Sequence, residues 1–227
     1  MSTRTPKRRF LFAPETFNLG ETSRGVEVAR ALTEAGHDVR FMGYSRTYAP
    51  YIREAGFELD LLTPEVDDAL AARFFAFEQG RSPQFPFTTH MVHTRVRNEL
   101  DLIARWQPDA VIIGTTLTLL LSARIAGVPL IYLRPYPLSA SHLASVSSLP
   151  LRVHAGLTSR CINHLAGFLV GKLARHLRWK PAAFRRVARE HGLRLPRRTA
   201  AMLDADLAPI ASLFPMLDGR PLVSGEV

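Results

Sequence analysis

Short apolar runs alternate with longer amphipathic stretches along the chain between Phe10 and Leu133. The runs Phe10–Ala13, Ala110–Gly114 and Val128–Leu133 are continuously apolar, as is typical of parallel strands covered on both faces. The segment Phe57–Leu61 alternates apolar and acidic residues, which predicts a strand with one exposed face. The stretches between these runs have helical length. Strands that alternate with such helices imply right-handed βαβ crossovers, so the pattern predicts an α/β fold with a doubly wound parallel, Rossmann-like sheet.

The helices are bounded by residues that commonly begin or end helices. We expect helices at 26–35, 48–55, 68–78, 89–106 and 115–126. Val28, Leu32 and Ala35 are expected on the buried face of the first one, and Gly36 ends it. Thr115 or Thr116 is the expected cap of the last one, and Gly127 ends it.

The segment Arg9–Gly43 is predicted to form the first strand–loop–helix–strand unit of the sheet. Its first strand is followed by residues 14–25, which include Pro14, Gly20 and Thr22 and are predicted to form a loop. In parallel α/β sheets the loops at the carboxyl ends of the strands face the ligand crevice. Residues 14–25 are therefore the first site candidates.

We expect one domain from residue 9 to 227, preceded by a disordered basic segment, 1–8. A Pro- and Ser-rich loop is predicted at 134–150, within a mainly helical region at 134–200, and short late strands are predicted at 206–207 and 222–223. No secretory signal and no transmembrane helix are predicted, because the apolar runs are short or interrupted. Cys161 is the only cysteine, which excludes a disulfide framework within the chain and fits a reducing cytoplasm.

Four segments in order resemble one enzyme family. They are Ala29–Val39 (ARALTEAGHDV), Gln107–Ile113 (QPDAVII), Ala126–Ile131 (AGVPLI) and Arg189–Pro196 (REHGLRLP). Together they resemble the amino-terminal, acceptor-binding half of a GT-B glycosyltransferase of the macrolide, antibiotic and sterol type. The resemblance implies an inverting hexosyltransferase that moves a sugar from a UDP- or dTDP-sugar co-substrate to a hydroxyl of a hydrophobic small-molecule or lipid acceptor, without another cofactor.

The chain departs from that family in two respects. The family's catalytic His falls on Glu21 and its orienting Asp on Gly114, so the dyad that removes the acceptor proton is absent. The chain also ends where the interdomain linker would begin, and it lacks the family's Gly-, His- and Glu-rich donor motif. We therefore expect the donor-binding half in trans or on missing sequence. A non-catalytic auxiliary subunit of a glycosyltransferase is the alternative.

Glu21 has two interpretations. It is the candidate catalytic base, provided that its pKa is raised towards neutrality, whereas Arg24, one turn later, would favour the ionised form. Alternatively, Glu21 only stabilises a helix start through the macrodipole. The predicted acceptor-binding residues follow strands or lie near the aromatic segment: Asn18, Gly20, Thr22, Ser23, His90, Thr115, Thr116, Arg134 and Tyr136.

Aromatic and basic residues suggest further contacts. A Phe-rich stretch at 74–87 either lines an acceptor pocket or belongs to the core. His90 and His93 have metal-compatible spacing but lack a third ligand, so no metal is expected. The net charge is +9, and the basic segment 172–189 either contacts an anionic membrane, peripheral to its inner face, or is a solvated helix surface. Nucleic-acid binding is not expected, because no recognised module accompanies the charge.

Overall fold

A computed structural model describes residues 6–135, 156–207 and 209–211. The chain divides into two compact units. Unit 1 comprises Met1–Ile131 and Pro181–Arg194, and unit 2 comprises Tyr132–Lys180 and Leu195–Val227. Each unit is described by itself below.

Unit 1 is built on a five-stranded sheet with the order β3-β2-β1-β4-β5. The strands are β1 (Arg9–Ala13), β2 (Asp38–Gly43), β3 (Leu59–Leu61), β4 (Ala110–Ile113) and β5 (Leu130–Tyr132). Strand β1 pairs in parallel with both β2 and β4, and β2 pairs in parallel with β3. The predicted α/β fold with a parallel, Rossmann-like sheet is therefore confirmed.

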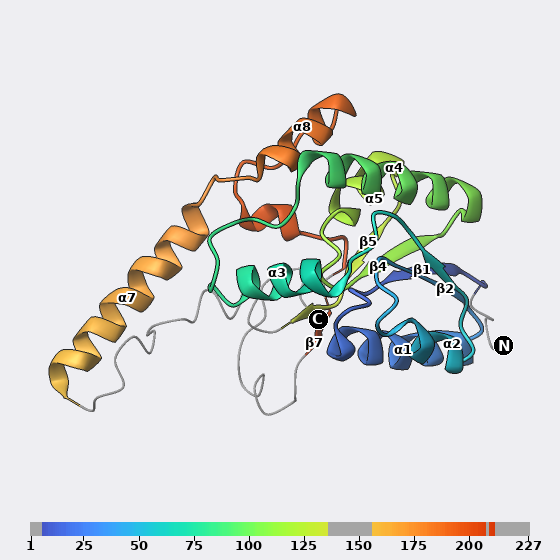
Figure 1. The fold of residues 1–227 in the computed structure, drawn as a ribbon, viewed down its shortest axis with the longest axis horizontal. Coiled ribbons are helices and arrows are strands. Elements are labelled where there is room, and N and C mark those ends of the chain that lie inside the picture. Colours follow the sequence, from blue (N-terminus) through green and yellow to red (C-terminus); the bar gives the residue numbers. More distant parts are fainter. Residues whose placement is uncertain (1–5, 136–155, 208, 212–227) are drawn as a thin grey trace. The chain divides into compact units, whose positions relative to one another are not determined.

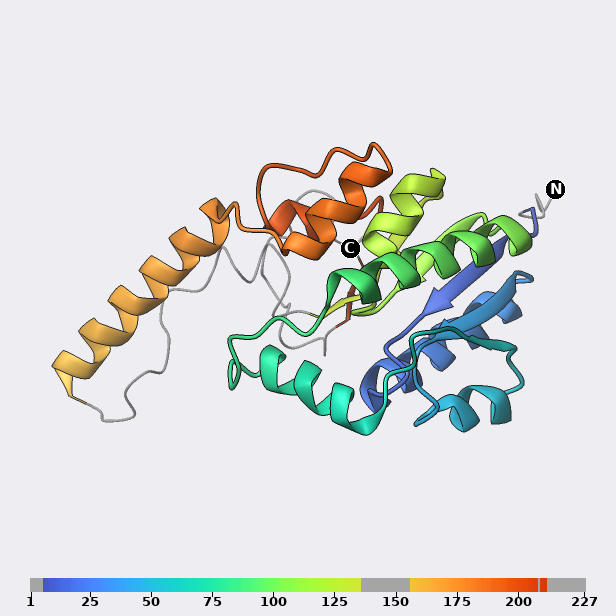
Figure 2. The ribbon, with the colours of Figure 1, turned by 45° about the horizontal axis from the view of Figure 1, so that its top comes forward.

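Helices cover both faces of this sheet. They are α1 (Leu19–Glu34), α2 (Ala49–Glu54), α3 (Asp68–Glu78), α4 (Thr89–Trp106), α5 (Leu119–Ala126) and α8 (Ala182–Glu190). Helices α1 and α2 lie on one side of the sheet, and α4 and α5 lie on the other (Figure 1). Helix α8 lies beside α4 (Figure 2), and its apolar residues Phe184 and Val187 are buried.

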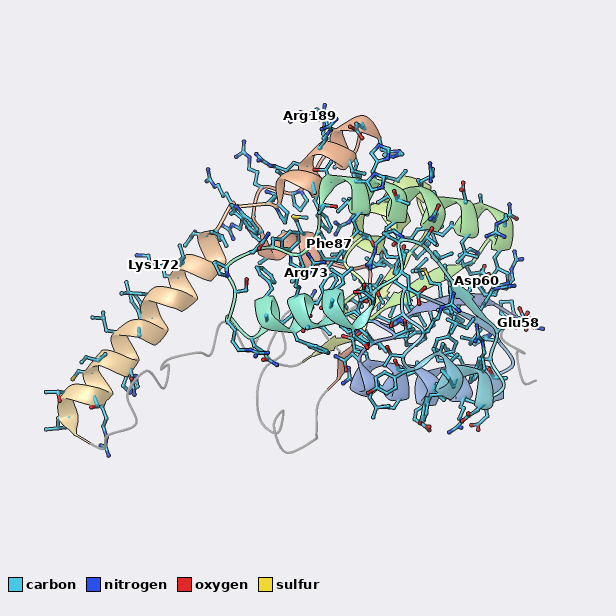
Figure 3. The ribbon with its side chains drawn as sticks, viewed as in Figure 1. Glu58, Asp60, Arg73, Phe87, Lys172 and Arg189 are labelled. Atoms are coloured by element: carbon cyan, nitrogen blue, oxygen red, sulfur yellow. The ribbon has the colours of Figure 1, made fainter. Side chains whose placement is uncertain are left out.

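Leu59, Asp60 and Leu61 of β3 are all half-buried, so the strand does not show the separate exposed polar face that its alternating pattern predicts. Arg40 on β2 pairs with Asp60 at 2.6 Å and with Glu58 at 3.0 Å; both acids are labelled in Figure 3. In contrast, β1 and β4 carry buried side chains such as Leu11, Phe12 and Ile113. The central strands are thus apolar on both faces, because helices cover both sides of them.

Helix α1 begins earlier and packs differently than predicted. It starts at Leu19, so Gly20, Glu21 and Thr22 belong to its first turns and not to a loop. Its buried face contains Val26 and Ala29, whereas Val28 and Leu32 are half-buried and Ala35 is exposed. The reason is Gly25, whose missing side chain allows the helix to approach the rings of Phe12 and Phe41.

Helix α5 begins later than predicted. Its N-cap position is Thr118, so Thr115 and Thr116 do not cap it. Instead, the Thr116 hydroxyl donates to the Ala13 carbonyl oxygen at 3.0 Å. This hydrogen bond joins the carboxyl ends of β4 and β1.

Unit 2 contains a short parallel pair and a long helix. Strand β6 (Arg134–Pro135) pairs with β7 (Ile210–Ala211). Helix α7 spans Leu157–His176, and a 3-10 helix, η2, spans Ala200–Leu203. Of the predicted late strand 206–207, Leu207 forms a β-bridge, and its carbonyl oxygen accepts from Tyr132 N at 2.9 Å. The strand β7 follows three residues later. Residues 136–150 of the predicted loop and the predicted strand 222–223 lie outside the described residues.

The predicted disordered segment 1–8 is described only from residue 6. Within it, Lys7 pairs with Asp38 and Arg8 with Asp109, each at 2.8 Å. These two basic side chains hold the start of β1 beside the starts of β2 and β4.

Candidate functional site

Glu21 joins the carboxyl ends of β1 and β4. It lies in the first turn of α1 and is buried. Its Oε2 accepts from the backbone N–H groups of Glu15 and Thr115, each at 3.0 Å, and its Oε1 accepts from the Thr115 hydroxyl at 2.6 Å. A carboxylate that receives three hydrogen bonds is held in one position.

Gly114 leaves the space that the Glu21 carboxylate occupies. A Cβ atom at position 114 would overlap Glu21 Oε2. The two positions therefore meet in space, although they lie on different elements and far apart in the sequence. Glu21 and Gly114 are complementary, because a side chain at 114 would force the Glu21 carboxylate away from its three donors.

A second buried carboxyl, that of Glu15, follows β1 directly. It faces the guanidinium of Arg95 on α4, with Glu15 Oε1 3.9 Å from Arg95 Nη1. Both side chains are buried, and among the described residues no hydrogen-bond partner is found for Glu15 Oε2 or for Nε, Nη1 and Nη2 of Arg95. Arg95 instead stacks on the ring of Tyr44, with Cζ 3.7 Å from the ring centroid, a cation–π contact in an apolar setting.

A third buried carboxyl belongs to Glu99, one turn after Arg95. It accepts hydrogen bonds from the hydroxyls of Tyr44 (2.7 Å), Thr118 and Ser122. These donors come from the end of β2, the start of α5 and α5 itself. Glu99 thereby satisfies the polar groups of three neighbouring elements within the core.

Burial controls the protonation of this centre. It raises the pKa of the Glu15 carboxyl from 4.5 to about 8, with the negative charges of Glu21 and Glu99 acting in the same direction and Arg95 opposing them. Burial prevails because Arg95 is 3.9 Å away and forms no hydrogen bond to Glu15. Burial likewise raises the pKa of the Glu99 carboxyl, although the hydrogen bonds that it accepts act to lower this pKa. Burial and the negative charge of Glu99 raise the pKa of the Tyr44 hydroxyl. Glu15 is thus predominantly protonated at neutral pH.

The aromatic residues around this centre mostly pack on one another. Phe17 stacks on Phe74 at 5.5 Å between ring centroids, and Phe74 meets Phe87 edge to face at 4.9 Å. Phe87, labelled in Figure 3, also contacts Phe184 of α8. These four rings are buried, which favours the core interpretation for them. Half-buried rings lie at the edge of the cluster: Phe75, Phe77 and Phe85.

The structure brings part of the predicted site together at the start of α1. Asn18 is the N-cap, and its side chain accepts from the N–H groups of Gly20 and Glu21. The Thr22 hydroxyl donates to the Asn18 carbonyl oxygen, and the Ser23 hydroxyl donates to that of Gly20. These side chains stabilise the first turn of α1, beside the Glu21–Thr115 contact.

The other predicted residues belong to other elements of the chain. His90 is exposed at the start of α4, and the neighbouring His93 forms an ion pair with Glu190 of α8 at 2.8 Å. Arg134 belongs to unit 2, where its Nη2 donates to the Leu203 carbonyl oxygen at 2.6 Å and its guanidinium lies over the Tyr132 ring. Tyr136 lies outside the described residues.

Sequence reasoning missed Arg95 and Glu99, although their spacing contains a signal. The buried apolar residues Val92, Val96 and Ile103 lie on one face of α4, and positions 95 and 99 fall on that same face. Charged residues on the apolar face of a helix are rarely buried unless they have partners. This pattern predicts a buried polar centre, but it does not identify the partners.

The described part of the chain contains neither a candidate metal site nor a candidate membrane span. Within them, no group of three or more His, Cys, Asp or Glu side chains is arranged to hold a metal ion. None of their helices has the length and apolar character needed to cross a bilayer.

Solved structures similar to this chain are glycosyltransferases. The spinosyn forosaminyltransferase SpnP matches with a TM-score of 0.56 and 16% identity, over 98% of this chain and 50% of SpnP. SnogD from Streptomyces nogalater matches with a TM-score of 0.53 and 18% identity, over 97% of this chain and 51% of SnogD. VinC in complex with dTDP matches with a TM-score of 0.52 and 18% identity, over 89% of this chain and 48% of VinC. No protein-family model matches the sequence, and no curated protein matches it significantly.

The fold and these likenesses define the fold class of the chain. The chain has the Rossmann-like α/β fold of one half of a GT-B glycosyltransferase, consistent with the amino-terminal half. It spans about half the length of the glycosyltransferases that it matches.

Proposed function

We propose that this chain is the acceptor-binding half of a GT-B glycosyltransferase that transfers a sugar from a UDP- or dTDP-sugar to a hydroxyl of a hydrophobic acceptor. The donor-binding half would lie on sequence outside this chain. In the reaction, the acceptor oxygen attacks the anomeric carbon, the bond from that carbon to the phosphate oxygen breaks, and the nucleoside diphosphate leaves. The acceptor proton passes to a base on this chain, and a single displacement inverts the anomeric configuration.

The contact between positions 21 and 114 is the observation that carries the proposal. The resemblance places the family's catalytic His at Glu21 and its orienting Asp at Gly114, two positions on separate elements. A Cβ at Gly114 would overlap the Glu21 carboxylate, so the structure brings together the two positions that the dyad would need. This proximity agrees with the alignment that the resemblance gives and supports the proposal.

Two carboxyls compete for the role of base. Glu21 occupies the position of the family's His, but its oxygens already accept from Glu15 and Thr115. The Glu15 carboxyl has a pKa of about 8, close to the value that suits proton transfer near neutral pH. We assign the role to Glu21 by position and treat Glu15 as the competitor that the experiment must separate from it.

A non-catalytic auxiliary subunit is the second candidate function. The specific observation in its favour is that Glu21 is used within the chain, because its three hydrogen bonds join the ends of β1 and β4. In that case the half-fold would bind an acceptor or a partner glycosyltransferase without abstracting a proton.

The test combines this chain with a GT-B donor-binding half encoded by a neighbouring reading frame. Release of UDP or dTDP is measured with hydrophobic polyketide and lipid alcohols as acceptors, and acceptor binding to the chain is measured separately by fluorescence. We expect turnover that needs both halves. We also expect Glu21→Gln to lower kcat by roughly a hundredfold or more, with acceptor binding retained.

The matched control is Glu27→Gln, which removes an exposed carboxylate that pairs with Arg30 on the same helix. It should leave kcat unchanged. A loss in Glu15→Gln but not in Glu21→Gln would transfer the base role to Glu15. Acceptor binding without turnover would favour the auxiliary subunit, and the absence of both binding and turnover would refute the proposed function.

A further inference from the structure

Helix α7 of unit 2 carries its apolar side chains on its exposed face. Leu165, Phe168, Leu169 and Leu173 are between 54% and 63% exposed, and their spacing places them on one side of the helix. The opposite side contains Ser159, Gly167 and Gly171, which are buried. A surface helix of a water-soluble fold normally has the reverse arrangement.

The large exposed apolar residues concentrate in this unit. Of the ten found among the described residues, only Leu19 and Tyr51 belong to unit 1. The others lie on or near α7 in the sequence, or late in the chain: Leu157, Ile162, Leu165, Phe168, Leu169, Leu173, Trp179 and Leu207. Exposed apolar residues gathered on one helix face, as on α7, commonly mark a binding surface.

The sequence around this face contains basic but no acidic residues. No Asp or Glu occurs between Asp109 and Glu190, so α7 and its flanks carry only basic charges. Lys172 lies among the apolar residues of the face, with its ammonium group 5.9 Å from the centre of the Phe168 ring. Figure 3 shows side chains projecting along the length of α7, including that of Lys172. Arg178 and Lys180 follow the helix and flank the exposed Trp179.

These features fit a lipid surface better than a protein. Lys is depleted in the cores of protein–protein interfaces, whereas a long basic side chain among apolar residues can extend its charge to lipid phosphates. Trp prefers the boundary between the apolar and aqueous regions of a bilayer. A helix with a broad apolar face and basic flanks lies in the plane of an anionic membrane surface.

The face differs from the predicted membrane segment, 172–189. The second part of that segment forms α8, whose Phe184, Val187 and Ala188 are buried. Basic residues of α8 such as Arg185 and Arg189 are therefore not accompanied by an exposed apolar face. The apolar contribution comes from α7, amino-terminal to most of the predicted segment.

We propose that α7 is a peripheral membrane anchor that inserts Leu165, Phe168, Leu169 and Leu173 into the headgroup region of an anionic bilayer. Lys172 and Arg178 then meet lipid phosphates. The inference stands apart from the proposed sugar transfer, because it rests on residues of unit 2 alone. It predicts binding to vesicles in the absence of any nucleotide sugar or acceptor.

The test is co-sedimentation of the whole chain with vesicles of phosphatidylcholine alone or mixed with phosphatidylglycerol. We expect binding only to the anionic vesicles, weakened by added salt because the ionic attraction is screened. Leu165→Gln and Leu169→Gln should each weaken binding by about tenfold, since each removes most of an apolar side chain that the membrane would bury. Lys172→Gln should weaken it by roughly fivefold.

Matched controls lie on α2 of unit 1, where Tyr51 and Arg53 are exposed. Tyr51→Gln and Arg53→Gln should bind vesicles as the unchanged chain does, and circular dichroism checks that all variants fold. Equal binding to both vesicle types, or equal loss in the α2 variants, would overturn the proposal. So would a chain that ignores vesicles but self-associates through α7, because a second copy would then cover the face.

Discussion

The buried Glu15 carboxyl makes a prediction about stability that can be worked out from its surroundings. Its pKa is about 8 in the folded chain against 4.5 for the free group, because burial disfavours the charged form. The folded state therefore binds this proton more tightly than the unfolded state does. Stability should fall as pH rises from about 4.5 to about 8, and Glu15 should contribute no further change above that range.

The magnitude follows from the two pKa values. With ~1.4 kcal/mol per pH unit, ionisation of Glu15 should cost about 1 kcal/mol of unfolding free energy at pH 5 and about 3 kcal/mol at pH 7. Glu15→Gln has nearly the same shape as the protonated acid and cannot ionise. As the pH rises from 5 to 7, the unfolding free energy of the variant should therefore rise by about 2 kcal/mol relative to that of the original chain.

Urea unfolding followed by circular dichroism over that pH range measures this difference. Glu27→Gln, which changes an exposed carboxylate on α1, is the control and should run parallel to the unchanged chain. If the curves of Glu15→Gln and the unchanged chain are also parallel, Glu15 does not hold a proton in the folded state. The account of the buried centre would then be wrong.

Two further predictions concern neighbouring contacts. Gly114→Ala should destabilise the chain by about 1 to 3 kcal/mol, because the added Cβ displaces the Glu21 carboxylate from its donors. In a Glu21→Ala background the same change should cost clearly less. An equal cost in both backgrounds of the double-mutant cycle would refute the clash. Arg95→Gln removes the positive charge that lowers the Glu15 pKa, so in urea titrations the fall in stability should still begin near pH 4.5 but should continue to a higher pH. An upper end that stays unchanged or moves to lower pH would mean that Arg95 does not lower the Glu15 pKa.

The order of strands and helices could be predicted from the sequence because it depends on patterns between near neighbours. Continuous apolar runs indicate covered strands, and the strand β4 was found within its predicted run Ala110–Gly114. The start of α1 was predicted too late, although Asn18 and Glu21 have the spacing of a capping box. That signal is local and was available in the sequence.

Only the tertiary structure decided which charged groups meet. The periodicity of α4 places Arg95 and Glu99 on its buried face, but their partners Glu15, Tyr44 and Ser122 come from other elements. The strand order β3-β2-β1-β4-β5 sets the end of β1 beside the end of β4, which allows Glu21 to reach Thr115. Such contacts depend on how distant segments pack, and near-neighbour patterns do not encode that packing. For the same reason, the sequence does not reveal that the apolar face of α7 is exposed. Only the burial of Gly167 and Gly171 shows which side of the helix faces inwards.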